Sequence, residues 1–310
     1  MIEIIQLLIN GILLGSILAL GAVGATMIFG VLRFAHFAHG DFMAIGAYFA
    51  LTVVTVFNLP VLAALPVAML LTGGLAILID QVVYRRIRRV QPVILLIASF
   101  ATALVLRSFI QMVWGGSNQV YEAGIQLPLR FGPLTVKPDH LLIFAAAAGL
   151  VLIVHLFLSR TRMGKAMRAM SDNMDLALVT GIPANRVIMW TWGIGGALAA
   201  AAGVFLGMDT RLHPVMGWTL LLPIFAATIL GGIGRPYGAI LGGLVIGCAM
   251  ELSTLVIPGA YKPRWRSPSW WPRWSSGPRA SSRGLPAGHS GTARLRGGFS
   301  ESGRHLRDHG

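Results

Sequence analysis

Charged residues are scarce in this sequence: of its 310 residues only 12% are Asp, Glu, Lys or Arg, whereas 55% are hydrophobic. A soluble domain carries about 25% charged residues. Apolar runs of about 20 residues recur through most of the chain, and a run of that length can cross a bilayer as a helix. The composition therefore excludes an ordinary soluble domain and indicates an all-α polytopic membrane protein.

Cysteine and catalytic motifs are almost absent as well. Cys248 is the only cysteine, so no disulfide forms within the chain. The three lysines, Lys137, Lys165 and Lys262, stand outside any G-x-x-x-x-G-K-S/T sequence, so the chain has no P-loop with which to hydrolyse ATP. Neither an H-E-x-x-H sequence nor an ordered Ser, His and Asp set is present. We therefore expect neither an enzyme nor a cofactor in this chain.

Positive charge is distributed unevenly along the chain. The formal net charge is +14, and up to Tyr261 there are 15 Lys and Arg against 9 Asp and Glu. From Lys262 onward there are 10 against 2. The excess is therefore concentrated in the last residues, and the apolar part of the chain shows no basic surface that would predict nucleic-acid binding.

Eight apolar segments predict about eight transmembrane helices. The first is too long for a signal-peptide core and lacks a positive segment before it, so we expect it to be retained. The seventh is short, and its Gly231-Gly232-Ile233-Gly234 end allows a broken or re-entrant helix. The segments are Ile4–Phe29, Phe37–Phe57, Pro60–Ile79, Val93–Val113, Leu141–Leu158, Val187–Gly207, Thr219–Ile233 and Tyr237–Ile257.

The loops between these segments predict the orientation in the membrane. With the N-terminus outside, the inner loops hold eleven Lys and Arg and the outer loops hold three. Short cytoplasmic loops carry an excess of Lys and Arg, so the hydrophilic loop Ser159–Arg186 is expected to be cytoplasmic. The eleven are Arg33, Arg85, Arg86, Arg88, Arg89, Arg160, Arg162, Lys165, Arg168, Arg186 and Arg235, and the three are Arg130, Lys137 and Arg211.

The composition changes abruptly after Pro263. Residues 264–310 contain nine Arg and four Trp among many Ser, Gly and Pro. We therefore divide the chain into a transmembrane domain, residues 1–262, and a basic tail, residues 263–310. Three explanations of the tail stay open: a disordered segment, an arm that binds nucleic acid or lipid, and the product of a frameshift.

The frameshift hypothesis follows from the genetic code. If the lost frame takes the last base of each codon and two bases of the next, every Trp codon reads as Leu, Met or Val. Each TCN serine codon then reads as Phe, Leu, Ile or Val. Residues 264–276 would encode small and aliphatic residues throughout, as a membrane helix requires. This frame would add a ninth span and return the C-terminus to the cytoplasm.

The loop Ser159–Arg186 predicts a helix over Met163–Val179, closed by Gly181 at a C-cap position with Pro183 just beyond. One interpretation is a solvated loop that only sets topology. The other is a docking element. The pattern Asp175-Leu176-Ala177-x-x-x-Gly181 resembles the E-A-A-x-x-x-G cytoplasmic loop of ABC importer permeases, although the Leu-Pro that closes the longer motif is missing.

A second motif opens the second apolar segment. His36, His39 and Asp41 form too weak a set for a metal site, so we expect no metal, and we expect His39, Gly40 and Asp41 to cap the helix N-terminus. The run Phe37–Met43 with Gly46-Ala47-Tyr48 resembles the FAHGDFM…GAY signature of LivH-type permeases for branched-chain amino acids. The glycines of residues 231–243 resemble the same family.

The resemblance covers about residues 4–262 and implies a permease subunit of an importer in the bacterial inner membrane. Its implied partners are a second, LivM-type permease, two cytoplasmic ABC ATPase subunits that use ATP and Mg, and a periplasmic amino-acid-binding protein. Membrane lipid surrounds it, and no nucleic acid is implied. The loop would dock on an ATPase and transmit its closure. Its candidate coupling residues are Gly164, Asp175, Ala177, Gly181 and Arg186.

Two ionisable residues fall inside predicted spans, Arg107 and Glu251. Such residues are candidates for function, and the two could pair with each other. Structural pairing or snorkelling to the membrane surface is the alternative. A self-sufficient channel or secondary transporter that uses Arg107 and Glu251 is therefore the rival to the ATP-driven importer.

Overall fold

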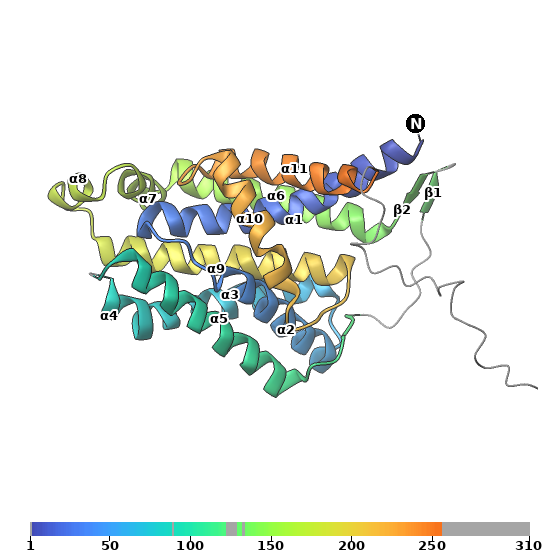
Figure 1. Ribbon diagram of the computed structural model, residues 1–310, viewed down its shortest axis with the longest axis horizontal. Helices are drawn as coiled ribbons and strands as arrows, with labels where there is room; N and C mark the ends of the chain where they lie inside the picture. Colours follow the sequence, from blue (N-terminus) through green and yellow to red (C-terminus); the bar gives the residue numbers. More distant parts are fainter. Residues whose placement is uncertain (1, 89, 122–128, 132–133, 256–310) are drawn as a thin grey trace, which may run out of the picture. The chain divides into compact units, whose positions relative to one another are not determined.

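The computed structural model describes residues 2–88, 90–121, 129–131 and 134–255 (Figure 1). These residues form a helical bundle with one short antiparallel hairpin, in which Leu129 lies opposite Val136. The elements are α1 Ile2–Leu32, α2 His39–Phe57, α3 Val61–Ile79, the π-helical turn η1 Asp80–Tyr84, α4 Arg85–Ile87, α5 Pro92–Trp114, β1 Leu129–Phe131, β2 Leu134–Val136, α6 Pro138–Arg160, α7 Arg162–Asp172, α8 Met174–Val179, α9 Ala184–Asp209, α10 Met216–Gly231 and α11 Pro236–Ser253.

All eight predicted spans are helices, and the all-α polytopic class is confirmed. Within the described residues seven helices are long and apolar enough to cross a membrane, and α10, with 16 residues, is a shorter apolar helix. The third span continues beyond its predicted end through η1 to Ile87. The hairpin β1–β2 was not predicted, because its three-residue strands are too short to show a pattern. The basic tail lies outside the described residues.

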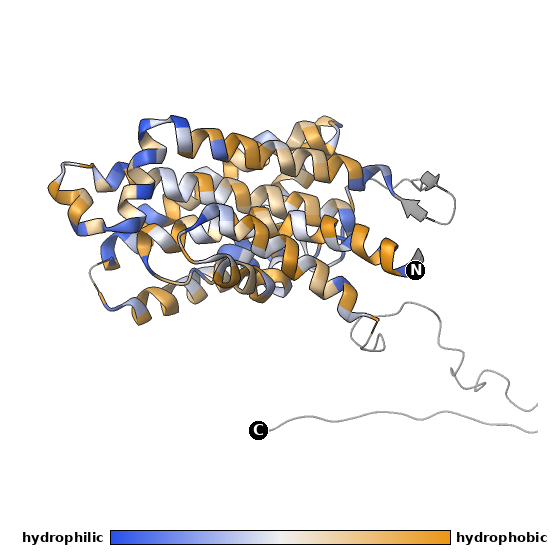
Figure 2. Cartoon of the chain, turned by 90° about the horizontal axis from the view of Figure 1, so that it is seen from above, coloured by the Kyte–Doolittle hydropathy of each residue, from blue (hydrophilic) through white to orange (hydrophobic). Residues whose placement is uncertain are grey.

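Three helices form the interior of the bundle. The apolar windows of α1, α2 and α9 are 83%, 72% and 72% buried, whereas those of α6 and α11 are only 22% buried. The outer helices nevertheless expose large apolar side chains, such as Leu70 of α3 and Met112 of α5, each 78% exposed. Figure 2 shows hydrophobic residues along the outer helices and hydrophilic residues gathered near their ends. Apolar side chains on the outside indicate contact with lipid rather than water.

Small residues bring α1 and α11 into close contact. A Cβ added to Gly11 would lie 2.8 Å from the Cα of Cys248, and one added to Gly15 would lie 2.8 Å from the Cα of Leu244. Gly247 faces α1 in the same way. Small residues at four-residue spacing allow such approaches in lipid, where apolar burial drives little association between helices. The tight packing predicted from these glycines is confirmed.

Two helices begin inside the bundle rather than at its ends. The ring of His39, the first residue of α2, bonds the carbonyl oxygen of Gly21 at 2.9 Å. Gly21 precedes the end of α1 by eleven residues, or about 16 Å at the usual rise. The first turn of α10 packs against the first turn of α2, because a Cβ added to Gly40 would lie 2.5 Å from the carbonyl oxygen of Gly217. Helix α10 is therefore short because it begins inside the bundle, and it runs unbroken to Gly231 in the glycine-rich stretch where the sequence allowed a broken or re-entrant helix.

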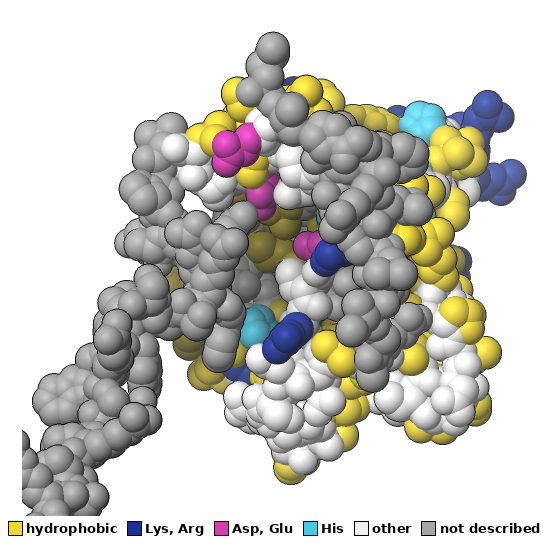
Figure 3. Space-filling view, turned by 90° about the vertical axis from the view of Figure 1, so that its right-hand side faces the viewer, with side chains coloured by type: hydrophobic (Ala, Val, Ile, Leu, Met, Phe, Trp, Pro, Cys, Tyr) yellow, Lys and Arg dark blue, Asp and Glu magenta, His cyan; other side chains and the backbone are white. Residues whose placement is uncertain are grey.

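The two ends of the bundle differ in charge. Helices α7, α8 and α4 lie together at one end (Figure 1), where Arg85, Arg86, Arg162, Lys165 and Arg168 are exposed. The opposite end, seen in Figure 3, shows Asp and Glu side chains close to Lys and Arg side chains. There His140 and Asp209 approach to 3.2 Å. The end that carries α7 and α8 is therefore the basic end.

Candidate functional site

The loop between α6 and α9 forms a helical hairpin of two helices, α7 and α8. The prediction of a single helix over Met163–Val179 is wrong. Asn173 separates them with an extended backbone, φ −150° and ψ 105°. Its side-chain oxygen accepts the backbone N–H of Leu176 at 3.0 Å. Asparagine is among the strongest N-cap residues, so Asn173 stops one helix and starts the next.

The start of the hairpin is anchored on α6. The hydroxyl oxygen of Thr161 accepts the backbone N–H of Gly164 at 2.9 Å and caps α7. Gly164 itself packs on the last turns of α6, where an added Cβ would lie 2.5 Å from the Cα of Leu158. A larger residue here would push α7 away from α6. Gly164, chosen from the sequence as a coupling residue, thus sets the angle between a transmembrane helix and the hairpin.

The end of the hairpin is a glycine cap, as predicted. Gly181 has φ +82°, a conformation that glycine adopts at little cost. The backbone N–H of Gly181 donates to the carbonyl of Leu178 at 3.0 Å, and that of Ile182 donates to the carbonyl of Ala177 at 3.1 Å. This pair of bonds is a Schellman motif. Ala177 is buried, so α8 turns its predicted motif residue inward and leaves Asp175 exposed.

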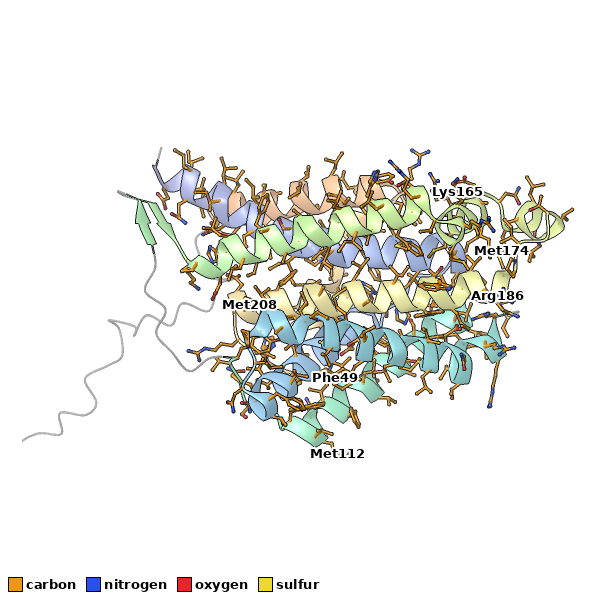
Figure 4. All side chains as sticks on the ribbon, turned by 180° about the vertical axis from the view of Figure 1, so that it is seen from behind. Phe49, Met112, Lys165, Met174, Arg186 and Met208 are labelled. Carbon is orange, nitrogen blue, oxygen red and sulfur yellow. The ribbon has the colours of Figure 1, made fainter. Side chains whose placement is uncertain are left out.

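The tip of the hairpin exposes apolar side chains. Leu176, Leu178 and Val179 of α8 are 62%, 46% and 85% exposed. Exposed basic residues lie near them on α7 and at the start of α9, and Figure 4 shows Lys165 and Arg186 at this end of the molecule, far from Met208 at the other end of α9. Adjoining exposed apolar side chains with a polar rim mark contact surfaces. We call residues 161–186 the hairpin and Leu176, Leu178 and Val179 its apolar tip.

A second charged site lies inside the bundle, where α2, α5 and α10 meet. The Arg107 guanidinium donates to both carboxylate oxygens of Asp41, at 3.1 and 3.2 Å. The Asp41 side chain is 0% exposed and that of Arg107 is 18% exposed. The guanidinium carbon also lies 4.9 Å from the centre of the Trp218 ring. A two-bond ion pair with a cation–π contact fixes the Arg107 side chain in one orientation.

This geometry corrects two expectations. Arg107 takes its carboxylate partner from α2, and the proposed pairing with Glu251 of α11 is replaced by the pairing with Asp41. The capping role is also wrong: the N-cap of α2 is Ala38, and no side chain caps it. Instead of capping α2, the Asp41 carboxylate bonds Arg107 of α5 and the His39 ring bonds the carbonyl of Gly21 in α1. Both side chains are directed to neighbouring helices and not to the free N–H groups at the start of their own helix.

An aromatic cluster beside this site was not found from the sequence. The rings of Tyr84 and Trp192 stack with centroids 5.0 Å apart, and the His36 ring nitrogen Nε2 lies 3.0 Å from the Tyr84 hydroxyl. Asp80 and Arg88 form an ion pair next to it. These residues come from distant parts of the chain. The sequence pointed to only two of them, for other reasons: His36 was considered as a weak metal ligand, and Arg88 was counted for the orientation alone.

Two titratable groups at the other end are held neutral. Burial raises the pKa of Tyr121 well above its ordinary value, and its hydroxyl donates to the carbonyl of Ala47 at 3.0 Å. Burial lowers the pKa of His213, whose carbonyl accepts the N–H of Met216 at the start of α10. Tyr121 thus attaches its connecting segment to α2 through a neutral group, whereas the bond of His213 belongs to the turn that opens α10.

Comparison with known families gives one strong match. The profile described as branched-chain amino acid transport system / permease component matches residues 7–272. No solved structure matches the chain.

Individual proteins of known name are similar over most of their length. The high-affinity branched-chain amino acid transport system permease protein BraD of Pseudomonas aeruginosa is 32% identical over 272 residues, covering 83% of this chain and 89% of the relative. LivH of Escherichia coli is 30% identical over 278 residues, covering 83% and 88%. The probable LivH of Methanocaldococcus jannaschii is 30% identical over 269 residues, covering 83% of each.

Proposed function

Because the chain belongs to the family of branched-chain amino acid transport permeases, we propose that it is the membrane-spanning subunit of an ATP-driven importer for branched-chain or related amino acids. It is a multi-pass protein of the bacterial inner membrane. A periplasmic binding protein delivers the substrate in this proposal. A second, LivM-type permease and two ATPase subunits complete the assembly.

The helical hairpin of α7 and α8 is the observation that supports this proposal most directly. The sequence holds no P-loop, so the ATPase is a separate chain and must contact the permease at a surface. The apolar tip offers that surface at the basic end of the bundle. The positive-inside rule favours the cytoplasm for this end, which is where ATP is available.

The packing of α7 gives the hairpin a path to the interior. Helix α7 contacts α6, α1 and α9, and α1 and α9 are two of the three most buried helices. A rigid hairpin, capped by Thr161, Asn173 and Gly181, passes a push at its tip to these helices. In this mechanism closure of the ATPase moves the hairpin, and the hairpin shifts the bundle between outward and inward access.

The Asp41–Arg107 ion pair favours a passive translocation pathway in an ATP-driven importer over a secondary transporter that couples ions. A secondary transporter would use Arg107 with Glu251 to couple ions, but Arg107 is bonded to Asp41 and packed on Trp218. No side chain here has to break or form a covalent bond, since the ATPase supplies the energy and the binding protein supplies most of the selectivity.

Co-expression with the partner subunits tests this function. Val179→Asp places a charge on the exposed tip without touching the core, so we expect the permease to fold while the ATPase no longer co-purifies and uptake is lost. Asn118→Asp, which adds the same negative charge at an exposed position of the opposite end, is the control. If the Val179 variant retains the ATPase and full uptake, the hairpin is not the docking element.

A further inference from the structure

A cavity of about 440 Å³ opens beside α7, between the hairpin and the α10–α11 turn. Arg168, Ser171 and Asp172 of α7 line one side of it, and Arg235 and Tyr237 line the other. Its floor is apolar and formed by Met27, Val31 and Leu158, all of which are buried. The cavity therefore has a charged rim over an apolar base.

The cavity lies where the transmembrane helices end. Helix α1 ends at Leu32, α6 at Arg160 and α10 at Gly231, and α11 begins at Pro236; the cavity-lining residues of these helices stand within about two turns of those ends. Helix ends of this kind mark the boundary between hydrocarbon and headgroups. A ligand in this cavity is at the depth of a lipid headgroup.

The charges on the rim favour a phosphate group. Arg168 and Arg235 are both exposed, and neither takes part in an ion pair among the residues that the structure describes. Guanidinium groups bind phosphate oxygens through paired hydrogen bonds. Asp172 is the one acidic residue of the rim, and its carboxylate can accept a hydrogen bond from a headgroup hydroxyl.

A much smaller apolar pocket, of only about 10 Å³, adjoins the cavity. The two share Leu158, Pro236 and Tyr237, and the pocket is lined further by Val151, Val154 and other apolar residues of α1, α6, α9 and α11. His155 of α6 and Tyr237 of α11 share a hydrogen bond of 2.9 Å beside it. A pocket of this size is too small for an acyl chain, but α6 and α11 expose most of their apolar surface, and an acyl chain of the bilayer can lie on that surface next to the cavity.

We propose that this cavity binds one anionic phospholipid. The phosphate lies between Arg168 and Arg235, a headgroup hydroxyl such as that of phosphatidylglycerol bonds Asp172, and an acyl chain lies on the exposed apolar surface of α6 and α11. Basic pockets between transmembrane helices are suited to such headgroups. A bound lipid would connect the hairpin helix α7 to the start of α11. The site depends on the cavity alone and stands whether or not the hairpin docks an ATPase.

Native mass spectrometry of the purified full-length protein tests the site with phosphatidylglycerol, phosphatidylcholine and inorganic phosphate as separate probes. We expect one phosphatidylglycerol to be retained. The pair Arg168→Ala/Arg235→Ala should weaken it at least about tenfold, as expected for the loss of a charge-assisted hydrogen bond. The control pair Lys165→Ala/Arg186→Ala removes the same charge from exposed positions outside the cavity and should leave binding unchanged.

The unaltered protein provides a second measurement. A photoactivatable phosphatidylglycerol should crosslink to the peptides of α6 and α11 that contain Leu158 and Ile240, which line the small pocket beside the cavity. Equal loss in the control pair, equal retention of phosphatidylcholine, or crosslinks spread over the other helices would each overturn the proposal. Binding of inorganic phosphate that displaces no lipid would show a free-anion site and would also overturn it.

Discussion

At the scale of single residues, the Asp41–Arg107 pair shows how a charge is kept inside a membrane bundle. A buried ion pair is costly to form, because both groups leave water, and it is much more costly to break. Here both carboxylate oxygens of Asp41 are bonded, and the guanidinium face rests on Trp218. The pair also lies at the first turns of α2 and α10, because Asp41 belongs to α2 and Trp218 to α10. It therefore stabilises the contact between the two helices that begin inside the bundle.

Removing one partner of this pair should destabilise the bundle. Arg107→Met leaves the Asp41 carboxylate buried without its cation, so we expect a loss of about 3–5 kcal/mol, measured as thermal unfolding in detergent. The double variant Asp41→Leu/Arg107→Met buries no charge and should recover most of that loss. If the double variant unfolds as readily as the single one, the pair does not act as a unit.

At the scale of the element, the hairpin depends on its caps rather than on helix propensity. Its two helices have 11 and 6 residues, too few to be stable alone in water. Thr161, Asn173 and Gly181 each supply backbone hydrogen-bond partners or geometry at a helix end. These caps, together with the packing of α7 on α6, α1 and α9, give the hairpin a defined shape.

Gly181→Ala should weaken the hairpin without changing the bundle. An alanine at φ +82° costs about 1–2 kcal/mol, so amide hydrogens of residues 177–182 should exchange roughly ten times faster, by hydrogen–deuterium exchange with mass spectrometry. Gly149→Ala is the control, because Gly149 is inside α6 with open space around it and has helical geometry. Unchanged exchange in the Gly181 variant would show that the cap is not needed.

At the scale of the whole molecule, the distribution of charge predicts the orientation in the membrane. Basic residues gather at the end that carries the hairpin, while the opposite end mixes both signs. The Lys and Arg bias of eleven to three follows the same division. The hairpin is therefore expected to face the cytoplasm.

Single-cysteine labelling measures this orientation in intact cells. After Cys248→Ala, a cysteine at Lys165 should react with a membrane-impermeant maleimide only after the cells are opened, whereas a cysteine at Asn118 should react in intact cells. Both positions are exposed, so labelling reports on the side of the membrane and not on burial. The reverse pattern would place the hairpin outside and rule out contact with an ATPase.

The tail yields a prediction at the same scale. The frameshift hypothesis predicts an open aliphatic reading frame beneath codons 264–276, and sequencing of the coding DNA reads it directly. A version that carries this frame should reach higher membrane abundance, because an added span covers a helix-packing face. Equal abundance and uptake of the two versions would count against the hypothesis, and a polar or interrupted frame would end it.

Features set by local interactions could be predicted from the sequence, and contacts between distant residues could not. The spans were predictable because hydrophobic length along the chain is a local property. The Gly181 cap was also predictable, since its signal lies within a few residues. The break at Asn173 was missed, although asparagine is a known cap, because the surrounding residues suit one continuous helix. The partner of Arg107 was missed because Asp41 is far from it in sequence.

The sequence by itself thus determined the membrane class, the positions of the eight apolar helices, the family and the orientation to be expected. All of these follow from runs of residue types and from short motifs. Only the tertiary structure decided that α2 and α10 begin inside the bundle, that Arg107 pairs with Asp41, and that two arginines line one cavity with an apolar floor. The physical reason is that helices which pack closely bring together residues that the chain keeps far apart, and no local pattern records which helix faces which.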